Sequence, residues 1–495
     1  MSNSPNATHA SPASGTGLDA AVLKVAGVVV LGAIMSILDI TVVSVALRTF
    51  MEAFDTSYAV VGWTMTAYTL ALATVIPMSG WAADRFGTKR IYIAALILFT
   101  IGSALCAAAN SIGLLIAFRV LQGLGGGMLM PVGMTIMTRA AGPERVGRVM
   151  SVLGVPMLMG PIAGPILGGW LIDIASWHWV FLINVPIGIL AVIYAVIVLP
   201  KDVPSPGETF DFVGMLLLSP GLALLLYGVS VIPEKGTVTD PQVWATALVG
   251  AILIALFVRH AFKPKHPLLD LRLFENRQLT MSVIATFLFA MAFFGANLLL
   301  PSYFQQVRGE DTLHAGLLVA PQGIGAMITM PIAGKLADRM PISRVVVPGV
   351  ITICLGMIVL TQISATMPYP LLLTALFVTG LGMGAVMMPL FTAGLQTLTG
   401  PTIARGSTLL NIMQRVASAG GAAIMTVVLT NQTEHVTTPS AVADGFGVTF
   451  TVALVILALT IIPAWLLPHK IDDTETQVDP EPPEMSGEPA PALLH

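Results

Sequence analysis

The chain has 495 residues, of which 55% are hydrophobic and 10% are charged, and its mean hydropathy is +0.86. Soluble domains carry about 25% charged residues, so this composition excludes a soluble enzyme, a nucleic-acid-binding protein and a disordered chain. The formal net charge of −3 is unevenly placed, because residues 469–495 hold seven acids and one base. Cys106 and Cys354 lie in apolar runs, which indicates neither a disulfide framework nor a metal site.

Apolar stretches long enough to cross a bilayer recur along the whole chain. Each spanning helix needs about 20 predominantly apolar residues, and the segment before the first stretch lacks the basic start of a signal peptide. The sequence therefore predicts an all-α integral membrane protein. The predicted spans are 22–47, 57–80, 91–109, 112–136, 148–171, 178–199, 211–232, 243–262, 279–305, 313–336, 345–364, 369–395, 406–430 and 445–467, fourteen in all.

The basic residues predict the orientation. An even number of spans places both termini on one side, and that side carries 18 of the 23 Lys and Arg residues. Loops on the opposite side carry three, and two lie within spans. Because basic loops stay in the cytoplasm, we expect both termini to be cytoplasmic.

Two segments recur in the same order. Residues 80–85 (Gly-Trp-Ala-Ala-Asp-Arg) resemble residues 334–339 (Gly-Lys-Leu-Ala-Asp-Arg), and the glycine-rich run 123–127 resembles 380–384, at offsets of 254 and 257. Parallel repeats of this kind are typical of transporters that bind substrate between two halves. A chance likeness between glycine-rich helices is the alternative. The expected layout is a disordered leader (1–20), a six-helix half (21–200), a linker with two inserted spans (201–278), a second six-helix half (279–468) and an acidic disordered tail (469–495).

Two charges lie deep within predicted spans, and such charges usually serve a function. Asp39 is eight residues from the outer end of the first span, or about 12 Å. Arg119 is seven residues from the outer end of the fourth span, or about 10 Å. Because burial and a nearby guanidinium act oppositely on a carboxyl group, the pair predicts a site that loads and unloads a proton. A permanent Asp39–Arg119 assembly clamp, or a cap on a local kink, is the alternative.

Leu376 occupies the position of Arg119 in the second half, so the helix does not require the arginine. Arg415, near the inner end of the thirteenth span, is expected to be structural or gating.

The short loop between the second and third spans combines glycines with charges. Its carboxylate can face a helix N-terminus in the other half, and its bases can face helix C-termini. Such contacts would exist in one conformation and break in the other. The expected gating residues are Gly80, Asp84, Arg85, Gly87, Lys89 and Arg90.

The fifth span has small residues and prolines at regular spacing. Glycines four residues apart let another helix approach closely, and prolines remove backbone donors and bend the helix. The residues that indicate a hinge or a seal are Gly160, Pro161, Gly164, Pro165, Gly168 and Gly169.

These segments resemble the signatures of the major facilitator superfamily, in particular its 14-span drug:proton antiporter group (EmrB/QacA type). Residues 80–90 resemble the loop 2–3 signature, 115–127 the fourth-helix signature, and 160–169 the fifth-helix signature of antiporters. Residues 38–47 and 177–186 are similar to further landmarks of the group. Ser44, Arg48 and His178 depart from the residues usual there, which puts proton stoichiometry and substrate range in doubt.

The resemblance implies a major facilitator fold and a proton-driven efflux antiporter for lipophilic or cationic drugs in the bacterial plasma membrane. No phosphate-binding loop is evident in the sequence, so we expect a proton gradient as the energy source, no cofactor and no metal. The expected partners are a small-molecule substrate and the lipid bilayer, with no nucleic acid, and we expect a monomer. Some relatives work with a periplasmic adaptor, which nothing in this sequence identifies. A dedicated exporter of an endogenous metabolite or lipid, and a non-transporting membrane sensor, are the alternatives.

The substrate cavity is expected between the two halves. Its walls should come from the first, second, fourth and fifth spans and their partners. Methionines such as Met387 and Met388 suit an adaptable wall, although they also fill helix contacts. The candidate cavity residues are Trp63, Tyr68, Gln122, Asn297, Tyr303, Gln305, Gln322, Asn411 and Gln414.

Overall fold

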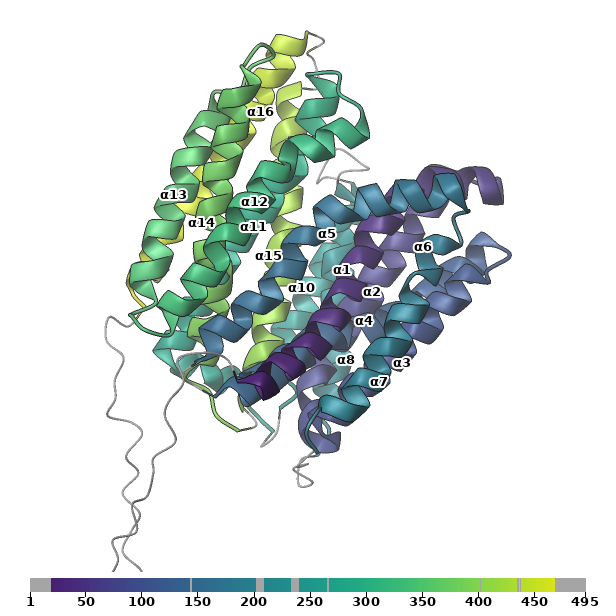
Figure 1. Ribbon diagram of the computed structural model, residues 1–495, viewed down its shortest axis with the longest axis vertical. Helices are drawn as coiled ribbons and strands as arrows, with labels where there is room; N and C mark the ends of the chain where they lie inside the picture. Colours follow the sequence, from purple (N-terminus) through teal and green to yellow (C-terminus); the bar gives the residue numbers. More distant parts are fainter. Residues whose placement is uncertain are drawn as a thin grey trace, which may run out of the picture.

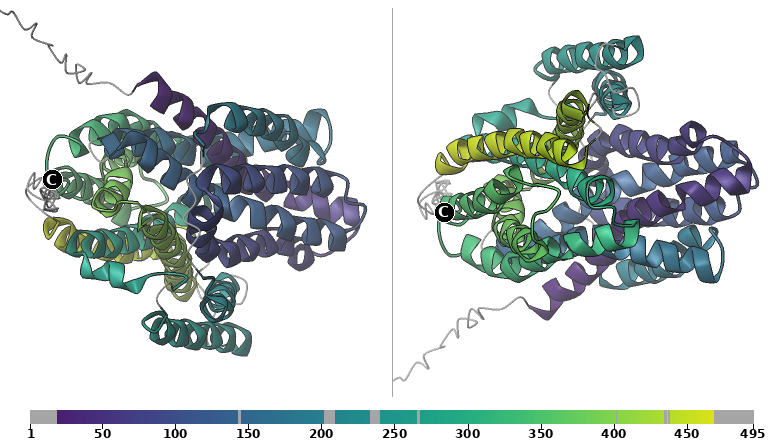
Figure 2. Two further views of the ribbon diagram at one scale, coloured as in Figure 1. Left: turned by 90° about the horizontal axis from the view of Figure 1, so that it is seen from below. Right: turned by 90° about the horizontal axis from the view of Figure 1, so that it is seen from above.

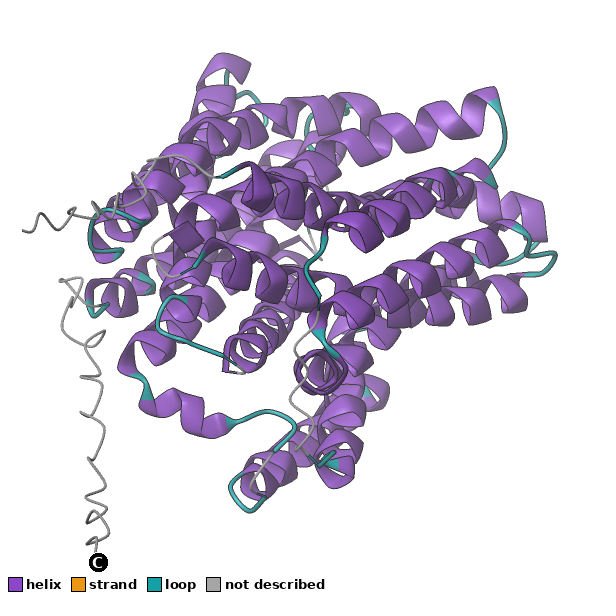
Figure 3. Ribbon diagram, turned by 60° about the horizontal axis from the view of Figure 1, so that its bottom comes forward, coloured by secondary structure: helices purple, strands orange, loops and turns teal. Residues whose placement is uncertain are grey.

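The structure is a computed structural model that describes residues 19–142, 145–201, 209–232, 240–264, 267–400, 402–433, 436 and 438–467. The regular structure of these ranges is helical, with no strand among them (Figure 3). The first group contains α1 (Ala20–Phe54), α2 (Tyr58–Phe86), α3 (Thr88–Ala107), α4 (Ile112–Ala141), α5 (Val146–Ile174), α6 (Trp179–Leu182) and α7 (Asn184–Val198). Then come α8 (Phe212–Ser230), α10 (Pro241–Ala261) and the short 3-10 helix η2 (Leu271–Glu275). The last group contains α11 (Arg277–Gln306), α12 (Thr312–Ala337), α13 (Ser343–Thr361), α14 (Tyr369–Leu395), α15 (Thr402–Thr433), α16 (Pro439–Leu459) and α17 (Ile461–Trp465).

Thirteen helical segments in the described ranges are long and apolar enough to cross a membrane. Two of them are composite, because α6 continues into α7 and α16 into α17. The remaining predicted span, 148–171, falls on α5, a helix of 29 residues whose side chains at 155–159, 161, 162 and 165 lie outside the described part. The all-α membrane fold is confirmed.

The predicted repeat is confirmed by matching glycine contacts. A side chain at Gly123 of α4 would collide with the backbone carbonyl of Tyr68 on α2, and one at Gly380 of α14 would collide with the carbonyl of Gln322 on α12. One turn on, Gly127 abuts Leu72 as Gly384 abuts Ala326. Corresponding glycines of the two halves differ by 257 in residue number, and the residues that they contact differ by 254. These are the same offsets as those of the sequence repeat. Because only a residue without Cβ fits these approaches, both halves share one packing scheme.

The helices form two groups with an inserted pair beside them. Figures 1 and 2 show α1–α7 as one group and α11–α17 as the other, while α8 and α10 lie together at the edge of the bundle. Helix α8 packs on α2 and also touches α15. Ser219 of α8 donates a hydrogen bond to the Thr74 carbonyl (2.7 Å), and the Tyr227 ring stacks on Trp63 at 5.5 Å. The inserted pair thus touches both groups, and the predicted domain boundaries stay a prediction.

The two groups converge toward one end, where α1 and α5 begin, and spread apart at the other (Figure 1). We call the first end, which carries residues 79–90, 131–148, 334–344 and 400–411, the gate end. There Arg148 forms an ion pair with Asp338 (3.0 Å), Ser79 hydrogen-bonds Thr408 (3.1 Å), and Ser407 donates to the Pro131 carbonyl (2.8 Å). The structure is therefore in a conformation with the gate end closed.

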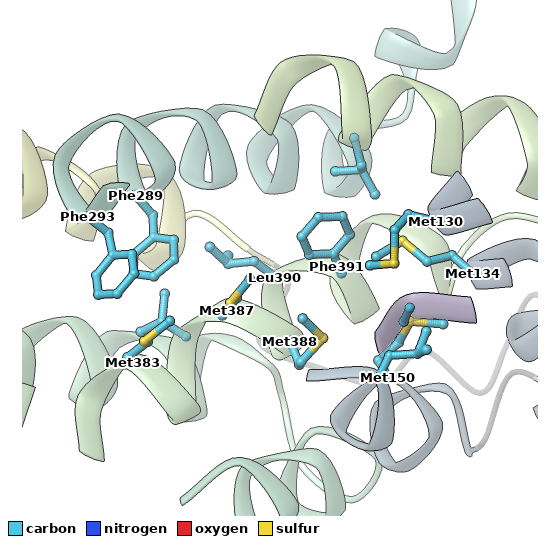
Figure 4. Packing of buried hydrophobic residues seen from close by; sticks show 14 of the residues in the cluster. Met130, Met134, Met150, Phe289, Phe293, Met383, Met387, Met388, Leu390 and Phe391 are labelled. Atoms are coloured by element: carbon cyan, nitrogen blue, oxygen red, sulfur yellow. The ribbon is translucent and has the colours of Figure 1, made fainter. Parts of the chain in front are cut away.

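Methionines from both groups meet in the apolar core near the gate end. Figure 4 shows Met130, Met134 and Met150 of the first group near Met388 of the second, and each is at most 9% exposed. Flexible thioethers adapt to changing neighbours, so this contact suits two surfaces that part and meet again.

Candidate functional site

The deepest charges of the first half form one buried network. Asp39 of α1 lies 2.5 Å from an Arg119 guanidinium nitrogen of α4. The other carboxylate oxygen of Asp39 accepts hydrogen bonds from the amides of Gln122 (2.7 Å) and Asn184 (3.2 Å). All four side chains are at most 1% exposed. The expected Asp39–Arg119 pair is therefore present in the structure, together with two amides that hold the carboxylate.

A second layer fixes the arginine. Its Nε donates to the Thr64 carbonyl at 3.0 Å, and its guanidinium lies 4.1 Å above the centre of the Tyr68 ring. Gln122 accepts from Arg119 at 2.7 Å and donates to Ser103 at 2.7 Å. The guanidinium is thus held by a carboxylate, a carbonyl, an amide and an aromatic face, which fixes its position.

This arrangement can respond to a proton. Two opposite charges in a buried site largely balance, whereas removing one leaves an uncompensated buried charge that costs several kcal/mol. A proton on Asp39 leaves Arg119 charged, because a guanidinium does not give up its proton in proteins. Protonation therefore creates a net positive charge in a site built for a neutral pair, which favours a rearrangement that rehydrates it.

The sequence did not single out three members of this network. Asn184 lies in a stretch quoted only as a family landmark, and Ser103 and Thr64 are small polar residues in otherwise apolar spans. A polar residue within a span is the available signal, but many such residues only bond their own helix backbone. Asn184 carries the clearest signal of the three, because its side chain has both a donor and an acceptor in an otherwise apolar stretch.

The second half has the same layout without the charges. Asn297 of α11, Gln322 of α12 and Thr379 of α14 line one small cavity of about 10 Å³. By the offsets of the repeat, Gln322 corresponds to Tyr68 and Thr379 to Gln122, while buried Leu376 takes the place of Arg119. At the matching positions that the structure describes, the second half therefore has no counterpart of this ion pair.

The candidate cavity residues do not share one cavity. Trp63 is 42% exposed and faces Tyr227 of the inserted pair, and Gln305 is exposed. Tyr303 is buried within the second half, where its hydroxyl donates to the Ser364 carbonyl (2.7 Å).

Two candidates on α15 do lie between the halves. Asn411 and Gln414 are buried, and the Asn411 amide contacts the sulfur of Met134 on α4 at 3.4 Å.

The glycines of α5 pack against α1. Side chains at Gly160, Gly164 and Gly168 would meet Ile37, Thr41 and Val42, whereas one at Gly169 would meet nothing within 4 Å. These three glycines form a stripe along α5 that fixes this helix beside α1, the helix that carries Asp39. The side chains of Pro161 and Pro165 lie outside the described part.

The loop 2–3 residues lie at the gate end. Gly87 has a positive φ of 96°, which suits glycine, and Gly80 lies close to the Ala404 backbone of the other half. Lys89 donates to the carbonyls of Val196 and Leu199 (both 2.7 Å). Its ammonium group thus lies at the C-terminus of α7, as expected for a base of this loop.

Asp84 is buried and pairs with Arg139 of α4 (3.0 Å). Arg139 also donates to the Gly400 carbonyl of the other half (3.3 Å), so this pair belongs to the closed gate. Arg85 is half-buried and Arg90 is exposed.

The repeat of this loop places a carboxylate at a helix N-terminus. Asp338 accepts hydrogen bonds from the backbone N–H groups of Gly147 (2.7 Å) and Arg148 (3.2 Å), at the start of α5, where the helix dipole favours an anion. Burial raises the pKa of the Asp338 carboxyl, and these hydrogen bonds oppose the rise. The contact joins the halves as expected for a gate, through the second-half copy of the loop.

Comparison with known proteins agrees with this architecture. The Major Facilitator Superfamily pattern matches residues 29–422. The chain is 50% identical over 421 residues to the multidrug resistance protein B homolog of Mycobacterium tuberculosis, covering 84% of this chain and 78% of that protein. It is 31% identical over 406 residues to the MFS-type transporter YhcA of Bacillus subtilis, covering 82% and 76%.

Solved structures share the fold at low identity. The human organic anion transporter MFSD10 superposes with a TM-score of 0.62 at 17% identity, covering 90% of this chain and 99% of that one. The proton:xylose symporter XylE superposes with a TM-score of 0.59 at 14% identity, covering 89% and 96%. The match over most of the chain, the duplicated six-helix packing and the many spanning helices lead to one conclusion: the chain is a multi-pass membrane transporter of the major facilitator superfamily and not an enzyme.

Proposed function

We propose that the protein is a proton-driven antiporter that exports small lipophilic compounds from a bacterial cell. The observation that carries this proposal is the buried Asp39–Arg119 pair with its two amide partners, in one half of a two-half transporter. The multidrug-resistance name of the mycobacterial relative supports the direction and the kind of substrate. The glycine stripe of α5, which resembles the antiporter signature, supports exchange.

The cycle follows from the contacts. We place the gate end at the cytoplasm, as the basic loops favour, so that both termini are cytoplasmic and the closed gate leaves the halves spread toward the outside. A proton from outside binds Asp39 and loosens its hold on Arg119. The gate contacts of Asp338 and Arg139 then break, the halves rock, and the proton leaves inward while a new substrate enters.

One proton per exported molecule supplies enough free energy for export. A proton that crosses a potential of 100 mV releases about 2.3 kcal/mol. Export of a neutral solute against a tenfold gradient costs about 1.4 kcal/mol. One proton therefore suffices, and no further energy source is needed.

The test compares Asp39→Asn with Asp444→Asn, a matched change at an exposed acid of α16. Purified variants in vesicles receive an imposed pH difference, and efflux of a fluorescent dye is followed. Asp39→Asn should lower gradient-driven efflux at least tenfold at normal folding, while Asp444→Asn should match the wild type. Dye flux that ignores the pH difference in the wild-type protein would refute the proposal.

Arg119→Ala gives a second measurement on the same pair. It leaves Asp39 buried without its counter-charge, so coupling of efflux to the pH difference should fail at normal expression. Growth of an efflux-deficient host on a panel of dyes and antibiotics then identifies the cargo. Resistance to none of them, with a metabolite accumulating in a deletion strain, would instead favour a dedicated exporter.

A further inference from the structure

Arg415 of α15 faces the first half in the middle of the bundle. It lies seven residues after Thr408 and four after Asn411, so the three share one face of the helix. Thr408 contacts Ser79 of α2, and Asn411 contacts Met134 of α4. Arg415 is also within electrostatic range of Tyr68, the residue stacked on Arg119. The sequence suggested a place near the gate end, but 13 residues of helix separate Arg415 from Thr402, or about 20 Å.

No counter-charge accompanies this arginine. Among the described residues, Arg415 takes part in no ion pair or hydrogen bond that the structure shows, although its side chain is partly buried. The acids of the surrounding helices are either paired elsewhere or distant. Asp39 binds Arg119, and Asp84 lies at the gate end. Asp444 is exposed near the start of α16. Unpaired charges inside a membrane are costly and usually face a cavity where a ligand or ion passes.

We propose that Arg415 is the anion-binding group of the transport path, and that the cargo is a small lipophilic anion bearing a carboxylate or a sulfonate. This inference rests on the proposed export function and names its substrate class. A guanidinium presents a fork of N–H donors that matches the paired oxygens of such groups. The side-chain amide of neighbouring Gln414 is a further donor, and Met134, which contacts Asn411, offers an apolar surface for the body of the cargo.

The same charges disfavour cationic cargo. The Asp39–Arg119 pair is neutral as a whole, so Arg415 leaves the middle of the bundle with one net positive charge. Like charges repel strongly where water is scarce. This revises the expectation of cationic drugs drawn from the resemblance.

The experiment measures equilibrium binding without any gradient. The purified full-length protein is dialysed against naphthalene-2-sulfonate or against trimethyl(2-naphthylmethyl)ammonium, which share a ring system and carry fixed opposite charges. The variants are Arg415→Gln, Arg415→Lys and Arg259→Gln, the last at an exposed arginine of α10. Thermal unfolding of each variant verifies folding.

The wild-type protein should bind the sulfonate more tightly than the ammonium compound. Arg415→Gln should weaken sulfonate binding 10- to 100-fold, the range expected for hydrogen bonds to a charged group. Arg415→Lys should retain binding within about tenfold, because it keeps the charge, and Arg259→Gln should match the wild type.

Equal sulfonate binding by Arg415→Gln and the wild type, tighter binding of the ammonium compound, or binding of neither probe would each overturn the inference. Should Arg415→Gln unfold, the wild-type preference and Arg415→Lys still decide. Because no proton gradient is present, failure here leaves proton coupling intact. Conversely, if the protein binds the sulfonate but its efflux does not depend on the imposed pH difference, only the proposed proton antiport is refuted.

Discussion

The amide nitrogen of Gln122 lies 2.7 Å from the carboxylate of Asp39, while the same side chain accepts a hydrogen bond from Arg119. One neutral residue therefore holds both members of the buried pair. Both buried charges therefore depend on this side chain for a hydrogen bond and for their position.

Gln122→Leu should lower gradient-driven efflux about tenfold, because the buried pair loses the amide that donates to Asp39 and accepts from Arg119. Efflux of a fluorescent dye from vesicles under an imposed pH difference measures the loss. Gln362→Leu, at an exposed position, should match the wild type, and unchanged efflux in Gln122→Leu would mean that the amide only fills space.

Gly164→Ala should destabilise the protein by about 1–3 kcal/mol, the usual cost of overpacking, and should impair transport. A Cβ at this position would collide with Thr41 of α1. Gly169→Ala, five residues along the same helix with open space around it, should be neutral or slightly stabilising. Thermal unfolding in detergent compares the two, and equal behaviour would show that the stripe does not hold α5 against α1.

Gly147→Ala should open the gate end. Its new methyl group would meet the Gly334 carbonyl and the Asp338 carboxylate across the interface, so the closed conformation loses stability relative to the open one. Distances between spin labels on α5 and α12 measure the populations, and efflux should fall several-fold.

Gly113→Ala provides the steric control, because a Cβ there meets nothing within 4 Å. It should leave the label distances unchanged. Unaltered distances in Gly147→Ala would mean that the gate tolerates a methyl group, and that close backbone contact does not hold it shut.

Export of the proposed anionic cargo should respond steeply to membrane potential at equal pH on both sides. One proton entering and one monovalent anion leaving move two elementary charges in the same direction, worth about 4.6 kcal/mol per 100 mV. Vesicles with potassium and valinomycin set the potential, and naphthalene-2-sulfonate efflux is followed. Efflux independent of the potential would exclude this exchange of one proton for one anion.

The sequence predicted the repeat and the ion pair because both depend on residue types with few other uses. A glycine run at a fixed offset reflects backbone contacts that no other residue permits, and the matching Gly123–Tyr68 and Gly380–Gln322 contacts confirm it. Asp39 and Arg119 were detectable because charges in apolar helices are rare. Their similar depth, counted along two helices, predicted the pairing that the structure shows.

Side-chain direction was harder to predict. Trp63 lies in a span whose neighbours include lipid, the first half and the inserted pair, and the sequence gives no means of choosing α8 as its partner. For Arg415 it was the depth in the membrane that was hard to predict. This depth depends on where α15 begins, and helix ends are the least certain feature of a sequence pattern. That no acid in the described part of the chain pairs with Arg415 is apparent only once every surrounding helix is in place.

The cavity lined by Asn297, Gln322 and Thr379 shows what duplication made available to this protein. The first half carries the buried acid and base, whereas leucine, glutamine and threonine stand at the matching positions Leu376, Gln322 and Thr379 of the second half. Substitutions around α11, α12 and α14 therefore leave the contacts of Asp39 with Arg119 in place. Variants selected for a changed cargo should collect on these helices and around Arg415 rather than beside the buried ion pair.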